Sequence, residues 1–384
     1  MKRILLLVCC LWVWKAQGQG YNNHTTFTSL EWDNDFHASR NKTDQNYTNG
    51  IRATVLHSGR IAQNRWFFNW VLFNTRKQTH CMNGFQLGQD MFTPSDLAET
   101  DPRKMDRPYA GYTFLKFQRV SASRTNGTRI YSSNSVGLFG RSSRADRVQK
   151  FIHNDLDLGK PPLGWEAGTL RTELILLDYQ FMYEGRLLAG LYEKIRGLAF
   201  SNGPAHHTNT PIHPNFDIIS SIYARVGQVK NEVGFALLTK MGWFNNHFLS
   251  TLPMYENDNR YRYRLDRQTS LNTHQGRVYS NWRQNTELGR FRPHQIYFFA
   301  RPSFTLVASN SFLQGGLLNT LGSTGEPVPI ISNNELNRYL PGLDYGVVIA
   351  FGWFNFSYST CYRYPEFREG TPHKWGQMSL SVLY

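Results

Sequence analysis

The sequence has few cysteines, no long apolar run after its first twenty residues and few charged residues. It contains 4 Cys among 384 residues, which is too few for a disulfide-rich scaffold. The sequence leaves open whether Cys81 and Cys361 form a disulfide. After the first twenty residues, no run approaches the roughly 20 apolar residues that a membrane-spanning helix needs. Charged residues make up only 18% of the chain, although the mean hydropathy is −0.48. These deficits argue against a disulfide scaffold and against a helical membrane protein.

Aromatic residues and positive charge are, by contrast, abundant. Phe, Trp and Tyr together reach 15% of the chain. That much ring surface must be buried in protein or in lipid, which excludes a disordered chain. Lys and Arg number 42 against 28 Asp and Glu, which gives a net charge of +14. This excess favours anionic partners such as phosphates, lipopolysaccharide or nucleic acid.

The N-terminus has the pattern of a secretory signal peptide. Lys2 and Arg3 form a basic start, the apolar stretch Ile4–Trp14 follows, and small and polar residues come after it. The apolar stretch is too short to span a bilayer as a helix. We therefore expect residues 1–20 to be removed and residues 21–384 to form one domain, because no low-complexity linker or change in composition divides them.

The rest of the chain alternates strand-like runs with turn-forming residues. The runs are rich in Tyr, Phe, Trp and Thr, and polar stretches with Gly, Asn, Asp or Pro separate them. Apolar and polar residues alternate clearly in Ile51–Val55, in Phe85–Asp90 and in the final run Gln377–Tyr384. Such alternation places the apolar side chains on one face of a strand. Continued toward the N-terminus, it places Thr48 on the same side as Arg52.

The alternation, the composition and the aromatic last residue together favour an all-β fold, a transmembrane antiparallel β-barrel of the bacterial outer membrane. A barrel closed in lipid turns apolar side chains outward and polar ones into the lumen. About 12 strands of ~10 residues with long loops would use the mature chain. One loop would carry a short helical segment at Ala145–Asn154. A soluble β-sandwich is the alternative, since alternation is weak evidence in any single strand.

The densest polar cluster lies near the start of the mature chain. On a strand, Glu31, Asp33 and Asp35 share one face, and Leu30 and Trp32 share the other. If the apolar pair meets lipid, three carboxylates point into the lumen, where a cation such as Ca²⁺ would relieve their repulsion. Turn chemistry is an equal alternative, because Asn, Asp and Gly fill loops for conformational reasons.

Two further polar segments contain candidate functional residues. We expect Asp106 and Arg107 to form a salt bridge within a loop. In the helical segment, Gln149 and His153 are four residues apart and share a helix face. His153 is a candidate general base, because the ordinary pKa of histidine lies near neutral pH. A hydrogen-bonded structural histidine is the common alternative. No Gly-x-Ser-x-Gly, His-Glu-x-x-His or Walker context supports other chemistries.

The order of these landmarks resembles the outer-membrane lipid A 3′-O-deacylase family. The resemblance covers both ends and the first half of the chain, and no single motif in it is specific. The matching segments are Asp33-Asn34-Asp35, Asp44, Tyr47-Thr48-Asn49-Gly50, Gln89-Asp90, Thr93-Pro94, Asp106-Arg107-Pro108-Tyr109-Ala110-Gly111, Gln149 with His153, Gly164-Trp165, and Ser357 to Tyr384.

The resemblance implies a Ca²⁺-dependent esterase that removes an ester-linked acyl chain from lipid A. Asp35 would bind Ca²⁺ together with the backbone carbonyls of Asn34 and Gly50. The Asn34 side chain and Thr48 would position substrate or water, and His153 would activate the water. The expected partners are then lipid A, lipopolysaccharide and outer-membrane lipids, with no nucleic acid, and we expect a monomer.

Two positions beside the candidate base depart from the family pattern. Arg141 follows Gly140 where the family usually has Gly-Pro, and Gly168 stands where Gln is common. Because a fold does not fix a function, two other functions stay open. They are a non-enzymatic barrel, either a porin or a lipopolysaccharide-binding protein, and an esterase acting on phospholipids.

Overall fold

A computed structural model gives the arrangement of most of the chain. It describes residues 25–35, 46–58, 80–123, 127–155, 161–171, 173–185, 215–244, 247, 294–316, 328, 330–351 and 354–383. The predicted signal peptide, residues 1–20, and Asp44 of the family pattern lie outside the described residues. Among the described residues, no helix has the length and apolar character needed to cross a membrane.

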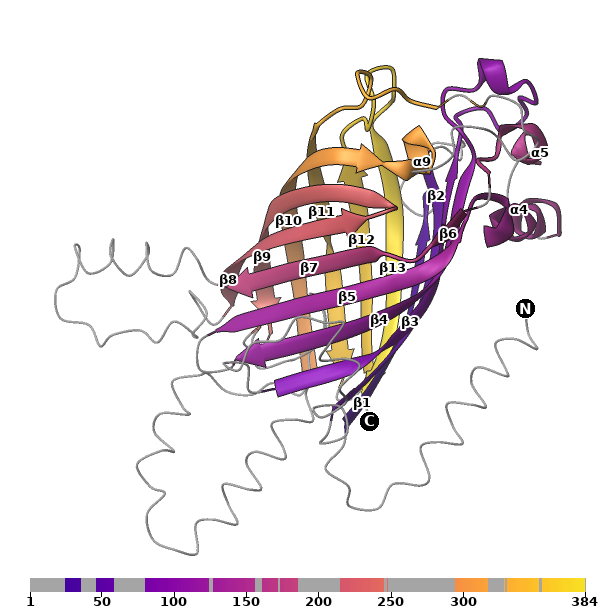
Figure 1. Ribbon diagram of the computed structural model, residues 1–384. Coiled ribbons are helices and arrows are strands. Elements are labelled where there is room, and N and C mark those ends of the chain that lie inside the picture. Colours follow the sequence, from indigo (N-terminus) through magenta and orange to yellow (C-terminus); the bar gives the residue numbers. More distant parts are fainter. Residues whose placement is uncertain are drawn as a thin grey trace, which may run out of the picture.

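The strands form one antiparallel sheet that closes on itself (Figure 1). They are β1 (Thr25–Asn34), β2 (Asn46–Ser58), β3 (His80–Thr93), β4 (Ala110–Ser123), β5 (Thr128–Phe139), β6 (Glu173–Ile175), β7 (Asp178–Gly185), β8 (Phe216–Gly227), β9 (Lys230–Trp243), β10 (His294–Asn310), β11 (Tyr339–Phe351), β12 (Phe354–Arg363) and β13 (His373–Leu383). Apart from β6, each strand pairs with its neighbours in sequence, and β1 pairs with β13 to close the barrel. The predicted antiparallel barrel is confirmed.

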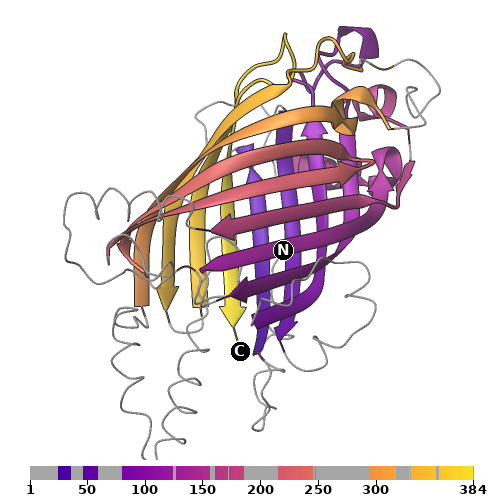
Figure 2. The ribbon, with the colours of Figure 1, turned by 60° about the vertical axis from the view of Figure 1, so that its left-hand side comes forward.

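The short strand β6 makes the wall a barrel of 12 strands with one extra piece. Both β6 and β7 pair with β5, β6 at its upper part and β7 at its lower part. Leu176 and Leu177 interrupt them, and both backbone N–H groups donate to the Gln228 side-chain oxygen, at 2.9 and 3.2 Å. This amide replaces the ladder bonds that the interruption removes, so the wall stays continuous (Figure 2).

The helical segments gather at one end of the barrel, which is the upper end in Figure 1. They are η2 (Pro102–Lys104), η3 (Gly140–Ser143), α4 (Ala145–Lys150), η4 (Phe151–Asp155), α5 (Trp165–Gly168) and α9 (Ser311–Gln314). β13 ends at the opposite, lower end. The helix expected at Ala145–Asn154 is thus present, in the connection between β5 and β6.

The two faces of the wall follow the predicted alternation. Val55 and Leu87 are exposed on the outer face, where a membrane barrel meets lipid. Arg52 and Gln86, one position out of phase, line a cavity of about 580 Å³ in the lumen. In the last strand Leu380 is exposed, while the alternating residues Gln377 and Ser379 line the same cavity.

Ion pairs fill much of the lumen. Glu31 and Asp33 face it as predicted, and Arg52 of the neighbouring strand pairs with Asp33. The Arg52 guanidinium donates to Asp33 at 2.6 Å and to Asp90 at 2.5 Å, and the Tyr47 hydroxyl donates to Asp33 at 2.7 Å. A single guanidinium thus pairs with two carboxylates of the lumen.

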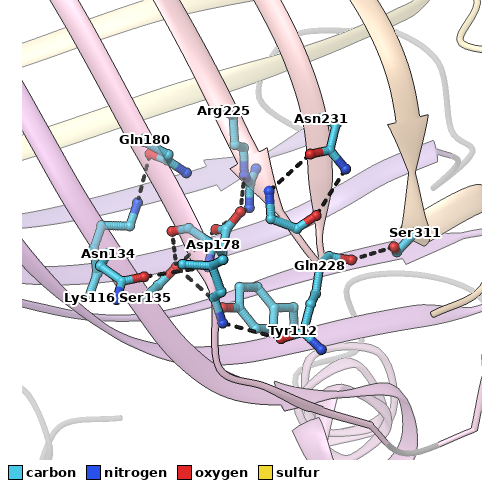
Figure 3. A network of polar contacts seen from close by, with 12 residues as sticks. Tyr112, Lys116, Asn134, Ser135, Asp178, Gln180, Arg225, Gln228, Asn231 and Ser311 are labelled. Carbon is cyan, nitrogen blue, oxygen red and sulfur yellow. Dashed lines mark hydrogen bonds and ion pairs between the residues drawn. The ribbon is translucent and has the colours of Figure 1, made fainter. Parts of the chain in front are cut away.

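A second lumen network joins β5, β7 and β8 (Figure 3). Arg225 donates to both carboxylate oxygens of Asp178, at 2.6 and 2.7 Å, and the Ser135 hydroxyl donates to the same carboxylate at 2.9 Å. The Tyr112 hydroxyl in turn lies 3.3 Å from Ser135. Since the Asp178 side chain is fully buried, this network ties three strands together by charge-assisted hydrogen bonds.

The loop before β4 corrects one sequence prediction. Asp106 and Arg107 do not form the expected salt bridge. The Asp106 carboxylate accepts from the backbone N–H of Ser95 at 3.0 Å. Arg107 is buried and instead reaches Glu366, at 3.5 Å, and the side chain of Asn46, at 3.1 Å. The true partner is distant in sequence, so neighbouring residues gave no sign of it.

The two cysteines of the described chain are both free thiols. Cys81 lies on β3 and Cys361 on β12. The sequence left their pairing open, and the structure shows that they are not bonded to each other.

Candidate functional site

A β-bulge at the start of β2 decides where Thr48 points. The pairing of β2 with β3 shifts register between Tyr47 and Asn49, so Thr48 is the additional residue. The Tyr47 hydroxyl accepts a hydrogen bond from Arg52, at 2.7 Å, and so lies in the lumen. The Thr48 hydroxyl lies 2.6 Å from that of Thr93 instead.

Thr93 identifies that side as the outer one. On β3, Thr93 is in phase with Phe85 and Leu87, which are both exposed on the outer face. Thr48, bonded to Thr93, therefore lies on the outer side of the wall. The prediction that Thr48 shares a side with Arg52 is wrong, because strand alternation holds only in the absence of a bulge.

Asn34 and Asp35 lie at the upper end of β1. Asn34 is the last residue of the strand and stands opposite Asn49. Trp32, two residues earlier, donates from its indole to the Asn49 side chain at 3.2 Å, which places Asn34 on the outer side with Trp32 and Thr48. Asp35 follows the strand and is buried. Since β1 ends at Asn34, alternation no longer determines the direction of Asp35.

The segment from η3 to η4 packs against the outer side of β3 and β4. The backbone carbonyl of Ser143 accepts hydrogen bonds from Gln89 at 2.8 Å and from Thr113 at 2.7 Å. Ala145 joins a buried apolar cluster with Met91 of β3. A side chain at Gly111 would collide with Ser143 and Ala145, so glycine is what lets the segment approach the wall this closely.

Gln149 and His153 occupy the buried face of this segment. Their exposed fractions are 1% and 5%, whereas Lys150 and Asn154 are exposed. The predicted shared face is therefore confirmed. His153 lies within η4, a π-helical turn, and such turns occur frequently at functional sites.

Trp165 of α5 holds Gln149 in place. The Trp165 indole donates to the Gln149 side-chain oxygen at 2.5 Å, and the ring packs on Tyr109 with centroids 4.7 Å apart. The amide nitrogen of Gln149 has no hydrogen-bond partner among the described residues. This fixed orientation leaves a buried donor one helical turn from His153.

The departure at Gly168 has a structural explanation. A side chain at Gly168 would collide with the sulfur of Met105, which belongs to the same apolar cluster as Tyr109 and Trp165. The backbone carbonyl of Gly168 accepts from the Tyr109 N–H at 2.9 Å. In this chain Met105 thus occupies space that a larger residue at this position would need. Arg141, the other departure, is exposed at the start of η3.

The structure therefore groups the predicted residues by side of the wall. Asn34 and Thr48 lie on the outer side, and His153 lies on a segment packed against that same side at the same end. Gly50 differs, because its Cα faces the lumen, where the Tyr47 hydroxyl fills the space of a side chain.

Sequence reasoning assigned no role to several residues that organise this region. Gln89 and Thr93 belong to the family pattern, and their phase with Leu87 could have placed them outside. Nothing in the sequence singled out Thr113. Trp165 was part of a matching motif, but its bond to Gln149 depends on the packing of α5.

The chemistry of the site is that of oxygen ligands and neutral donors. Among the described residues, no group of three or more His, Cys, Asp or Glu side chains could hold a metal ion. A site with a single carboxylate, such as that of Asp35, and backbone carbonyls would not count as such a group, because it holds fewer than three of these side chains. Such all-oxygen sets suit Ca²⁺.

Comparisons with known proteins agree with the fold. LpxR from Salmonella typhimurium has a similar structure, with a TM-score of 0.58 and 15% sequence identity, covering 93% of this chain and 99% of that chain. The β domain of the Bordetella autotransporter BrkA also matches, with a TM-score of 0.37 and 8% identity, over 94% of this chain and 99% of that chain. Comparison with curated protein sequences gave no match.

The family comparison is more specific. The sequence model described as "Outer membrane protein LpxR" matches residues 4–384, and this match confirms the resemblance drawn from the order of the motifs. Because the match spans nearly the whole chain and the fold is a closed barrel, the protein belongs to the LpxR family of outer membrane proteins.

Proposed function

We propose that this protein is a Ca²⁺-dependent esterase that hydrolyses an ester-linked acyl chain of lipid A in the outer membrane. The observation that carries the proposal is the side of the wall on which His153 lies. Its helical segment packs on the outer, lipid-facing side, beside Gln89 and Thr113. A lipid diffusing in the membrane reaches that side laterally, whereas a solute passing through a pore does not.

His153 acts as the general base in this proposal. A neutral imidazole takes a proton from a water molecule, whose oxygen attacks the ester carbonyl. The bond between the carbonyl carbon and the ester oxygen then breaks, and the imidazolium returns its proton to the departing oxygen. The acyl chain leaves as a carboxylic acid, and a hydroxyl group stays on lipid A. The Gln149 amide nitrogen supplies a donor near the base, fixed in direction by Trp165.

Oxygen donors at the end of β1 fit Ca²⁺. Asp35 supplies a buried carboxylate, and the backbone carbonyls of Asn34 and Gly50 would be the further ligands. When bound, Ca²⁺ would polarise the ester carbonyl and stabilise negative charge on its oxygen. Thr48 and the Asn34 side chain, both on the outer side, orient the substrate.

Mass spectrometry of lipid A tests the function. Purified protein in detergent micelles is incubated with lipid A, and His153→Ala is compared with the exposed control Arg368→Ala. The wild type and the control should release one acyl chain, and His153→Ala should not. Unchanged lipid A with folded wild-type protein would contradict the proposal.

A separate experiment tests the Ca²⁺ requirement. The same reaction is run in EGTA and then after adding back Ca²⁺ or Mg²⁺. Loss of activity in EGTA and recovery with Ca²⁺ is expected. Full activity in EGTA would refute the metal requirement while leaving the esterase in place.

A further inference from the structure

Four cations lie along the exposed side of the segment that carries His153. They recur every three residues, at Arg141, Arg144, Arg147 and Lys150, and all four are exposed. We call them the basic stripe. The buried side of the same segment holds Gln149 and His153, so the stripe faces away from the wall.

Within the part of the chain that the structure describes, the basic stripe has no ion-pair partner. None of the four side chains forms an ion pair or a hydrogen bond with another described residue. By contrast, Arg103, in the neighbouring loop, pairs with Asp101 at 3.0 Å. Asp146 is the one acidic residue among residues 140–150. The stripe therefore presents a local excess of positive charge to an external partner.

The backbone at Arg144 supports a role for the stripe outside folding. Arg144 has a φ of 59°, a left-handed conformation that glycine or asparagine adopts with less strain. A long cationic side chain is nevertheless present there, at the N-cap of α4. Strain of this kind is typical of positions held for function.

Exposed apolar side chains flank the stripe in the sequence. Phe151 follows Lys150 directly and is 46% exposed, and Leu138, three residues before Arg141, is also exposed. Cations beside exposed apolar groups are typical of segments at a membrane surface, where the apolar groups enter lipid and the cations meet anionic headgroups.

We propose that the basic stripe binds the phosphate groups of lipid A at the surface of the outer leaflet. Three of its four cations are arginines, whose planar guanidinium groups bind phosphate through paired hydrogen bonds. Phosphates at headgroup level lie beside the acyl chains, so a lipid held there stands next to His153. This inference rests on the proposed function, because lipid A is the substrate in both.

Binding measured without turnover tests the stripe. The full-length His153→Ala protein in detergent micelles is titrated with lipid A carrying its phosphates and with enzymatically dephosphorylated lipid A. The test variant adds Arg141→Gln, Arg144→Gln, Arg147→Gln and Lys150→Gln. A matched control removes the same number of positive charges from other exposed positions, with Arg103→Gln, Lys104→Gln, Arg368→Gln and Lys374→Gln.

The stripe variant should bind phosphorylated lipid A at least about 10-fold more weakly, since each cation near an anionic surface contributes measurably to binding. The control should bind nearly as the parent does, and dephosphorylated lipid A should not distinguish the variants. Equal binding by the stripe variant, or an equal loss in the control, would overturn the proposal. So would an equal loss for dephosphorylated lipid A.

Measurements of kcat and KM distinguish a failure of this inference from a failure of the proposed function. With His153 intact, the stripe substitutions should raise KM for phosphorylated lipid A and leave kcat unchanged. A charge-preserving variant, Arg141→Lys, Arg144→Lys and Arg147→Lys, should keep most of the affinity. If the wild type releases no acyl chain, the esterase proposal fails, while the binding titration still decides the role of the stripe.

Discussion

The ion pair between Asp178 and Arg225 gives a quantitative prediction about the stability of the barrel. Arg225→Met removes both guanidinium bonds and leaves the carboxylate in the wall with one remaining donor, Ser135 (Figure 3). Removing one partner of a buried ion pair destabilises a protein by roughly 3–5 kcal/mol. Ser135 remains and Arg225 is 16% exposed to the lumen, so we expect the lower end, about 3 kcal/mol.

Urea unfolding in lipid vesicles, followed by tryptophan fluorescence, measures this loss. The double variant Arg225→Met with Asp178→Asn should recover most of it, because a neutral amide needs no cation and still accepts from Ser135. A single variant that loses less than about 1 kcal/mol, within the range of an ordinary hydrogen bond, would refute the reasoning. So would a double variant as unstable as the single one. The kcat of the folded protein should stay unchanged in both, because the pair faces the lumen.

Four further outcomes are expected. Trp165→Phe keeps the ring but loses the donor to Gln149, so kcat should fall by about 10-fold, corresponding to about 1.4 kcal/mol; an unchanged kcat would contradict the positioning role. Thr48→Val should lower activity with less than about 1 kcal/mol lost in unfolding experiments, and equal activity would exclude Thr48 from the site. Burial alone would raise the pKa of Glu366. The positive charges of Lys230 and Arg107 together lower it by more, so the pKa of Glu366 lies below its ordinary value. The ionised Glu366 therefore stabilises the folded protein above the pKa of the unfolded state, and this contribution is lost as the pH falls through the pKa of the folded state. Glu366→Gln should thus flatten the decline of the unfolding free energy in acid. An unchanged slope would count against this. Finally, EGTA should abolish deacylation and added Ca²⁺ should restore it, with the released fatty acid as the readout.

The fold could be predicted from the sequence because its signal is periodic and local. Alternation in Ile51–Val55 and in Phe85–Asp90 assigned each side chain to lipid or lumen, and the structure agrees. The helical segment at Ala145–Asn154 could likewise be recognised from its own residues. These features depend on neighbours two to four positions away, which a single sequence displays directly.

Contacts between distant residues could not be predicted in this way. The partner of Arg107 is Glu366, not the adjacent Asp106. The three carboxylates near residue 31 indicated a cation, but Arg52 from the next strand neutralises Asp33. In both cases the sequence showed a charge that needed a partner, and the pairing of the strands determined which residue supplied it.

The bulge at Thr48 is the point at which alternation ends and the candidate site begins. A regular strand would have turned this hydroxyl into the lumen with Arg52 and the ring of Tyr47 toward lipid. One additional residue instead places Thr48 and Asn49 together on the outer side. Polar groups on that side are unfavourable against lipid unless something covers them, and the segment carrying His153 packs on the same side, against β3 and β4. The irregularity of β2 and the packing of this segment are thus two parts of one arrangement, which keeps a polar site on the outside of a membrane barrel.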